Sequence, residues 1–256
     1  MRAFLAAIVT VAVLAGGAMA APVEPYDAWR VDLASSYSHL TKGLAPWRSS
    51  SLALTYRPAP TDWLTAAVDR VSQFGLTDNV FSFNAVRTFA GKASFGGGFG
   101  VTSKAHFRPK YSFHLNGQTK PLWATASGLR LALAGDISTA RYRTGTVSSI
   151  QPALVLTDWR GDGLTLKGIA TRDETGRTLT GYALRGETPI TRSIRASLTY
   201  VNAPESDIGV TVKSSALSGA LLVDLPRAFT LRLSATQEWR TLFNRSELGL
   251  GLIRTF

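Results

Sequence analysis

Apolar and polar side chains alternate along this chain from residue 28 to its end. In residues 228–241, one set of alternate positions is apolar: Phe229, Leu231, Leu233, Ala235 and Trp239. The positions between them are polar or charged: Thr230, Arg232, Ser234, Thr236, Glu238 and Arg240. Successive side chains point to opposite faces of a β-strand, so this pattern predicts a strand with one apolar and one polar face.

Fourteen segments of this kind follow one another and predict an all-β chain. The expected strands are 28–41, 46–57, 62–74, 78–90, 92–103, 108–119, 126–142, 146–158, 163–173, 177–188, 193–203, 210–224, 228–241 and 245–256. The short connections between them contain turn-forming residues, as in residues 160–163 and 174–176. Connections this short join antiparallel neighbours. No helix-period segment and no linker interrupts the series, which predicts a single unit.

A soluble β-sandwich would show the same alternation, but three features favour a membrane-spanning barrel. The polar face carries charged side chains in strand after strand, whereas the apolar face holds almost none. The tryptophans lie near strand ends or in a connection, at Trp29, Trp47, Trp63, Trp123, Trp159 and Trp239. Tryptophan is enriched at the two membrane–water interfaces. The chain ends on Phe256, and a terminal aromatic residue is an assembly signal of outer-membrane barrels. We therefore predict a transmembrane antiparallel β-barrel of about 14 strands, with 12 as the alternative.

Residues 1–20 have the layout of a secretory signal peptide. Arg2 supplies the positive start, and an apolar stretch follows at residues 4–14. That stretch is too short to cross a membrane as a helix, which needs about 20 residues. We expect cleavage between Ala20 and Ala21, then a short lead at 21–27 and the barrel at 28–256.

The composition excludes several classes of function. The 256 residues include no cysteine, so disulfides, thiolate metal sites and cysteine nucleophiles are excluded. The net charge is +11, but the charged residues are scattered and form no basic run. Nucleic-acid binders concentrate their positive charge on one face, so we expect no nucleic-acid partner.

Two stretches resemble the YaiO family of outer-membrane β-barrel proteins. They are Gln73-Phe74-Gly75-Leu76-Thr77-Asp78, and Phe107-Arg108-Pro109 followed by KYSFHLNG. The resemblance covers residues 27–256, although Arg254 departs from the usual outer-membrane ending, which has an apolar or aromatic residue there. The resemblance implies contact with outer-membrane lipid and lipopolysaccharide, insertion by the barrel assembly machinery and, as for some relatives, an association with a surface-polysaccharide apparatus. It supplies no catalytic residues.

The polar face also supplies candidate residues for the inside of the barrel. They are Arg30, Asp32, Asp69, Lys110, His114, Lys167, Arg195, Arg232, Glu238 and Arg240. Six of them are basic and three are acidic, with His114 as a further polar residue. Either these charges pair with one another in a narrow packed barrel, or they give a wet lumen a positive bias that favours anions. The short connections indicate no constriction of that lumen.

Enzymatic chemistry has a weaker basis. Ser112 and His114 share a face of one strand, whereas the adjacent Ser38 and His39 point to opposite faces. A Ser–His hydrolase also needs an orienting group and an oxyanion site, and the pattern supplies neither. We expect no catalytic residue, no cofactor and no metal.

Two further motifs have structural explanations. The glycines at 96–98 lack the following helix that a phosphate-binding loop requires, so they indicate close packing in the barrel wall. The acids Asp158, Asp162, Asp173 and Glu174 are typical of turns rather than of a calcium site. The sequence thus predicts a small outer-membrane channel, or a barrel associated with a solute or polysaccharide, with a polar, net basic lumen. A structural barrel with a plugged lumen is the alternative, and a barrel hydrolase acting on lipid or lipopolysaccharide is the second alternative.

Overall fold

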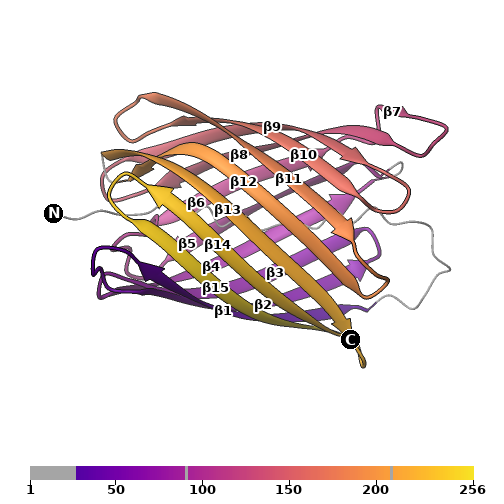
Figure 1. Cartoon of the computed structure of the whole chain (residues 1–256), viewed down its shortest axis with the longest axis horizontal. Coiled ribbons are helices and arrows are strands. Elements are labelled where there is room, and N and C mark those ends of the chain that lie inside the picture. Colours follow the sequence, from indigo (N-terminus) through magenta and orange to yellow (C-terminus); the bar gives the residue numbers. More distant parts are fainter. Residues whose placement is uncertain (1–26, 90–91, 208–209) are drawn as a thin grey trace.

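The computed structural model describes residues 27–89, 92–207 and 210–256, and strands make up nearly all of their regular structure. The strands are β1 (Trp29–Leu40), β2 (Trp47–Ala59), β3 (Asp62–Gln73), β4 (Leu76–Thr88), β5 (Ser94–Thr102), β6 (Tyr111–Gln118), β7 (Trp123–Ala124), β8 (Arg130–Arg141), β9 (Thr146–Thr157), β10 (Gly163–Arg172), β11 (Thr178–Pro189), β12 (Ile194–Asp207), β13 (Val210–Leu225), β14 (Phe229–Arg240) and β15 (Asn244–Thr255). All except the two-residue β7 form the wall of a closed barrel (Figure 1).

Every pairing in the barrel is antiparallel, and closure is made by β1 against β15. The N–H of Phe256 donates to the carbonyl of Trp29 at 2.9 Å, and the N–H of Trp29 donates back at 3.3 Å. The first and last strands therefore meet at one end of the barrel, which we call the terminal end. The opposite end, where β1 stops and β2 starts, is the loop end. A closed barrel leaves no unpaired strand edge, as a lipid environment requires.

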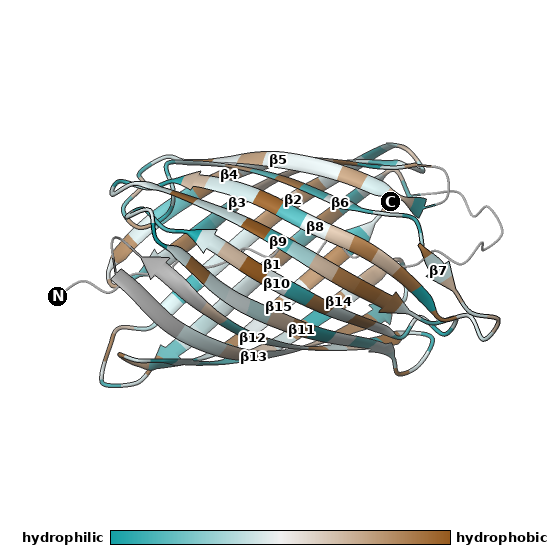
Figure 2. Ribbon diagram, turned by 90° about the horizontal axis from the view of Figure 1, so that it is seen from above, coloured by the Kyte–Doolittle hydropathy of each residue, from teal (hydrophilic) through white to brown (hydrophobic). Residues whose placement is uncertain are grey.

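The strand register separates an apolar outer face from a polar inner face. In β15, Leu248 and Leu250 point outward with 70% and 56% of their surface exposed. Glu247, Gly249 and Gly251 alternate with them and point inward. Brown and teal bands accordingly alternate along the strands (Figure 2). This arrangement is inverted relative to a soluble β-protein and is typical of a barrel whose outer surface meets lipid.

The structure confirms the predicted antiparallel barrel of about 14 strands, and several strands begin or end two to four residues from the predicted positions; β12, for example, continues to Asp207 rather than ending at 203. Residues 108–110 and 126–129 were expected to begin strands, but β6 starts at Tyr111 and β8 at Arg130. Gly128 adopts a φ of +86° in a turn in which its N–H bonds the carbonyl of Thr125 at 3.0 Å. Left-handed backbone of this kind favours glycine and ends the extended pattern.

The glycine run at 96–98 lies inside β5 and brings three strands close together. A Cβ atom on Gly98 would meet the Asn84 side chain, the Phe83 carbonyl and, at 2.8 Å, the His114 ring. Because β5 lies between β4 and β6, this position has room only for glycine. The run is therefore a packing feature of the wall.

The expectation that tryptophans mark the membrane interfaces fails for two of them. Trp29 and Trp239 are exposed on the outer face, but Trp47 is only 2% exposed and points into the barrel. Trp63 also faces inward, with the Arg57 guanidinium 4.0 Å from the centre of its ring. Aromatic side chains thus fill part of the lumen.

The predicted signal peptide, with Ala20 and Ala21 at its cleavage site, lies outside the described residues. Within the described ranges, no helix has the length and apolar character needed to cross a membrane.

Candidate functional site

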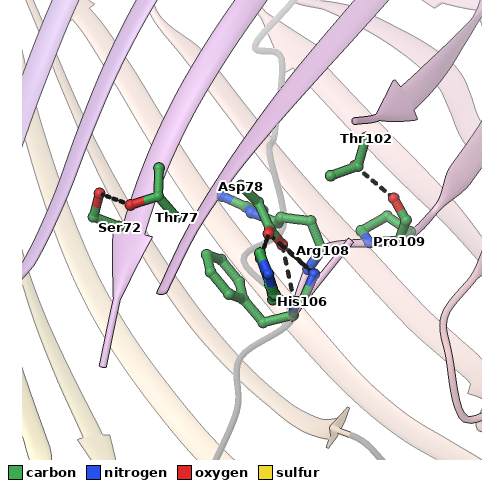
Figure 3. A network of polar contacts seen from close by, with 8 residues as sticks. Ser72, Thr77, Asp78, Thr102, His106, Arg108 and Pro109 are labelled. Carbon is green, nitrogen blue, oxygen red and sulfur yellow. Dashed lines mark hydrogen bonds and ion pairs between the residues drawn. The ribbon is translucent and has the colours of Figure 1, made fainter. Parts of the chain in front are cut away.

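The connection between β5 and β6, residues 103–110, folds onto the mouth of the barrel at the loop end, and we call it the mouth segment. Its backbone is bound by the carboxylate of Asp78, which lies on β4 and points inward (Figure 3). The N–H groups of His106, Phe107 and Arg108 donate to this carboxylate at 3.0, 2.9 and 2.8 Å. The Nδ1 atom of His106 lies 2.7 Å from it as well. Asp78 is fully buried, so these contacts replace the water that the carboxylate would otherwise bind.

The two ends of the mouth segment are bridged, which gives it a defined shape. The Thr102 hydroxyl donates to the Pro109 carbonyl at 2.6 Å, and the Thr102 N–H donates to the Lys110 carbonyl at 3.0 Å (Figure 3). Pro109 has no N–H to donate to a neighbouring strand, which explains why β6 starts only after it. Phe107 is 2% exposed and packs with Val71, against Phe74. The mouth segment is therefore anchored by polar and apolar contacts together.

Arg108 is the partly buried arginine of the mouth segment. Burial lowers the pKa of its guanidinium, and Tyr142, Asp69 and Asp78 counter that effect electrostatically, whereas Arg245 adds to it. A guanidinium remains protonated in spite of such a shift. Arg108 therefore places a permanent positive charge beside the inward acids of β3 and β4.

A second cluster lies on the wall formed by β1, β14 and β15 at the same end. Glu238 is bound by Arg240 and, at 2.8 Å, by Arg245, and both of its oxygens are thereby paired. Arg245 also approaches Glu247 at 3.6 Å, and Glu247 accepts a 2.6 Å hydrogen bond from Ser38. These charges are held in a connected, nearly buried network.

Aromatic side chains cover this ionic network. Trp47 makes edge contacts with Phe74 and Phe243, with ring centres 5.4 and 5.8 Å apart. Leu40 joins the cluster, and the Arg245 guanidinium lies 5.2 Å from the Trp47 ring. Together with the mouth segment, this cluster narrows the lumen at the loop end. The sequence indicates no constriction here, because its short connections give no sign of these inward side chains.

The predicted lumen residues occupy several different places. The register turns Arg30, Asp32, Asp69, His114, Lys167, Arg195, Arg232, Glu238 and Arg240 inward. Lys110 is the exception, because it precedes β6 and is exposed at the rim. The register also turns further charges inward: Arg57, Asp136, Arg130, Arg185, Glu187, Asp224, Arg245 and Glu247.

Most of these inward charges are paired. Arg30 bonds Asp32 at 2.8 Å, Lys167 bonds Asp136 at 2.9 Å and Arg185 bonds Glu187 at 2.9 Å. Arg195 and Asp224 are 3.2 Å apart. Among the described residues, Arg130 and Arg232 make no ion pair, and both lie toward the terminal end on nearly opposite sides of the barrel. The unpaired positive charge of the inner face is concentrated there.

The Ser–His arrangement considered for hydrolysis is not assembled. Ser112 and His114 both point inward from β6, but no hydrogen bond joins them in the described structure. His39 points outward while Ser38 points inward, as expected for neighbours on a strand. His106 uses its ring nitrogen on Asp78.

The turn acids satisfy their own turns. Asp158 accepts the N–H groups of Arg160 and Asp162 at 2.8 and 2.9 Å. Asp173 accepts those of Thr175 and Arg177 at 2.9 and 2.8 Å. In the described residues no group of three or more acids or histidines is placed to hold a metal ion.

Reasoning from the sequence misses Asp78, Arg108, Trp47 and Phe243 as mouth residues. A signal does exist for Trp47, because it is in phase with Ser49 and Ser51 of the inner face. Asp78 has no such signal, since its partners are backbone N–H groups 28 to 30 residues away.

No protein-family model and no curated protein sequence matches this chain. Solved structures do match. One is the CymD monoaromatic hydrocarbon channel, with a TM-score of 0.58 at 9% identity, covering 90% of this chain and 89% of that one. Another is the Acinetobacter baumannii outer membrane protein Omp33, with a TM-score of 0.58 at 7% identity, covering 89% and 98%. A bacterial polysaccharide outer membrane secretin has a TM-score of 0.57 at 10% identity, covering 91% and 100%. At these identities the similarity establishes the fold.

Proposed function

We propose that this protein is an outer-membrane channel of a Gram-negative bacterium that passes small anionic solutes through a narrowed mouth. The observation that carries the proposal is the inner face: it is polar along its length, and two of its inward arginines in the described residues, Arg130 and Arg232, make no ion pair. Positive charge in a water-filled bore with low-dielectric walls raises the local concentration of anions.

The outer face supports the membrane location in the proposal. Its large side chains are apolar and exposed on strand after strand, including Phe81, Phe113, Ile137, Leu198 and Leu248 at 54–70% exposure. A soluble protein does not expose so continuous an apolar belt. The predicted signal peptide at residues 1–20 and the terminal Phe256 agree with export and outer-membrane assembly.

The resemblance to the YaiO family and the fold similarity to the CymD channel and the polysaccharide secretin are compatible with this function. Outer-membrane lipid, lipopolysaccharide and the barrel assembly machinery are the partners that the proposal requires. A surface-polysaccharide apparatus is a further candidate partner that follows from the family resemblance alone.

The alternative is a structural barrel with a plugged lumen, and the buried side chains at the loop end favour this alternative. Trp47, Phe107 and Phe243 are buried at the loop end, and the charges beside them are paired. The two functions differ in one measurable property, because a plugged barrel passes no current.

Reversal potentials in planar bilayers test the proposed function. The refolded protein should conduct with a preference for anions over cations in a salt gradient. Arg130→Glu with Arg232→Glu should move that preference toward cations, because both side chains lie in the bore without a carboxylate partner. A matched control is Arg254→Glu, since Arg254 points outward at the same end and contacts the rings of Phe229 and Phe256.

Two results would overturn the proposal. Absence of conductance from folded protein, verified by its faster migration before boiling, favours the plugged structural barrel. An ion preference that does not change in the double variant means that the two arginines lie outside the conducting pathway.

A further inference from the structure

Outward-facing arginines are distributed unequally between the two ends of the barrel. At the loop end the register turns Arg48, Arg70, Arg141 and Arg172 outward, and all four are exposed. We call these four residues the arginine collar. They lie on β2, β3, β8 and β10, so the collar extends around much of the circumference.

No ion pair within the described residues neutralises the collar. Where the structure describes side chains, the strands turn no Asp or Glu outward at the loop end, and none of the four arginines makes an ion pair. At the terminal end the situation differs, because outward Arg87 bonds outward Asp62 at 2.7 Å. The outer surface of the loop end therefore carries positive charge that lacks a partner within the protein.

Neighbouring tyrosines place the collar at the height of lipid headgroups. Tyr37 is paired in register with Arg48, whose guanidinium lies 5.8 Å from its ring, and Tyr111 is paired with Arg141. Both tyrosines are outward and exposed. Amphipathic aromatic rings favour the boundary between hydrocarbon and headgroups. Arginine at that boundary interacts with anionic headgroups.

A groove runs from the apolar belt up to the collar on the outer surface of β6, β8, β9 and β10. Its volume is about 500 Å³. The outward side chains in its lower part are apolar: Phe113, Leu115, Ile137 and Ile150. Its upper part is formed by Thr139, Ser148, Thr178 and Arg172. The groove is apolar over its lower part and ends in hydroxyl groups and an arginine. This polarity matches that of an amphiphile lying along the membrane normal.

Arg141 is positioned beside this upper part. Its Nη1 donates to the Thr146 hydroxyl of β9 at 3.0 Å. Arg172 lies on the other side of β9, where it is paired in register with Ser148. Arg141 is level with Thr146 and Arg172 with Ser148, so the two arginines lie two strands apart and are also offset by two residues along β9. At about 4.8 Å per strand and 3.3 Å per residue their backbones are roughly 12 Å apart, a gap that two extended arginine side chains can span. A phosphate group between them would receive charge-assisted hydrogen bonds from both.

We infer that this groove binds a phosphorylated glycolipid of the outer leaflet, the lipid A part of lipopolysaccharide. An acyl chain lies on Ile137 and Ile150, and a phosphate lies between Arg141 and Arg172. The even number of strands places both termini at the same end of the barrel, and with that end in the periplasm the collar lies at the outer leaflet. The inference rests on the membrane location and the lipopolysaccharide contact of the proposed function, and it does not require conduction.

Lipid A binding by the refolded barrel in a neutral detergent tests the inference. The double variant Arg141→Gln with Arg172→Gln should bind purified lipid A about tenfold more weakly than the original protein, since each lost charge-assisted bond contributes on the order of one factor of ten or less. Arg87→Gln is the matched control and should leave the affinity unchanged. All variants are compared only after their shift in gel migration on boiling has verified folding.

A second measurement keeps the test decisive if the double variant does not fold. The original protein should bind lipid A stripped of its phosphates more weakly than intact lipid A, and phosphatidylglycerol should compete poorly. Equal affinity for the stripped lipid, or an unchanged affinity in the double variant, would overturn the inference. Equal binding of phosphatidylglycerol would show a general anionic site and would overturn the assignment to glycolipid. None of these outcomes depends on whether the barrel conducts.

Discussion

The backbone N–H of Arg108 donates to the buried carboxylate of Asp78 at 2.8 Å, across the mouth of the barrel. This bond and its neighbours from His106 and Phe107 join the mouth segment to β4. One carboxylate thus determines where an eight-residue connection lies, which makes Asp78 the residue at which the mouth is most sensitive to substitution.

Asp78→Asn should lower the free energy of unfolding by about 2–3 kcal/mol, because an amide is neutral and cannot accept three N–H groups and a ring nitrogen as a carboxylate does. Urea titration of the barrel in detergent measures the change. Asp62→Asn is the matched control: Asp62 bonds the 62% exposed Arg87, and its loss should cost less than about 1 kcal/mol. Equal effects of the two substitutions would contradict the assigned role of Asp78.

Phe107→Ala should destabilise the barrel by about 3 kcal/mol or more, because it removes a buried ring and leaves a cavity beside Val71 and Phe74. The control is Phe95→Ala, since Phe95 is 56% exposed on the outer face. Thermal or urea unfolding in detergent distinguishes the two. If Phe95→Ala cost as much in detergent, burial of Phe107 in the mouth would not be the cause.

Much of the fold was predictable from the sequence, whereas the mouth was not. A barrel strand has only two faces, so the alternation of residues such as Leu231 and Arg232 assigns both the strand and its outer side. The mouth segment depends on contacts between β4 and the connection that follows the next strand, β5, and no periodic pattern carries that information. Glu238 illustrates the limit: its inward phase and its nearness to Arg240 on the same strand were predictable, but its ion pair with Arg245 depends on the register between β14 and β15.

The two faces should differ in their response to a new charge. Leu233→Arg places an arginine in the lipid-facing belt near the middle of β14 and should cost about 2–4 kcal/mol. Ser234→Arg points the same side chain into the polar lumen and should cost less. Folding efficiency into lipid vesicles measures both effects, and equal efficiencies would contradict the assignment of the outer and inner faces.

The turn after β10 should respond to acid through Asp173. Hydrogen bonds from the Thr175 hydroxyl and from backbone N–H groups lower the pKa of Asp173 below its ordinary value of 3.8. Its stabilisation is therefore fully present above pH 3.8 and disappears as the pH falls through the lowered pKa. The change is measured as the rate at which an acid protease cleaves this turn, in the original protein and in the Asp173→Asn variant. If the difference in cleavage between the variant and the original protein were the same at every pH, this assignment would be contradicted.

The single-channel conductance of the original protein and of Asp78→Asn tests the central claim most directly, namely that the mouth segment narrows a conducting lumen. We expect the original protein to conduct and Asp78→Asn to conduct more at the same voltage and salt concentration, because the released mouth segment no longer occupies the bore. Asp62→Asn should conduct like the original protein. Identical conductance of all three proteins would show that the mouth segment does not limit the pathway, and no conductance from any of them would show that no pathway exists.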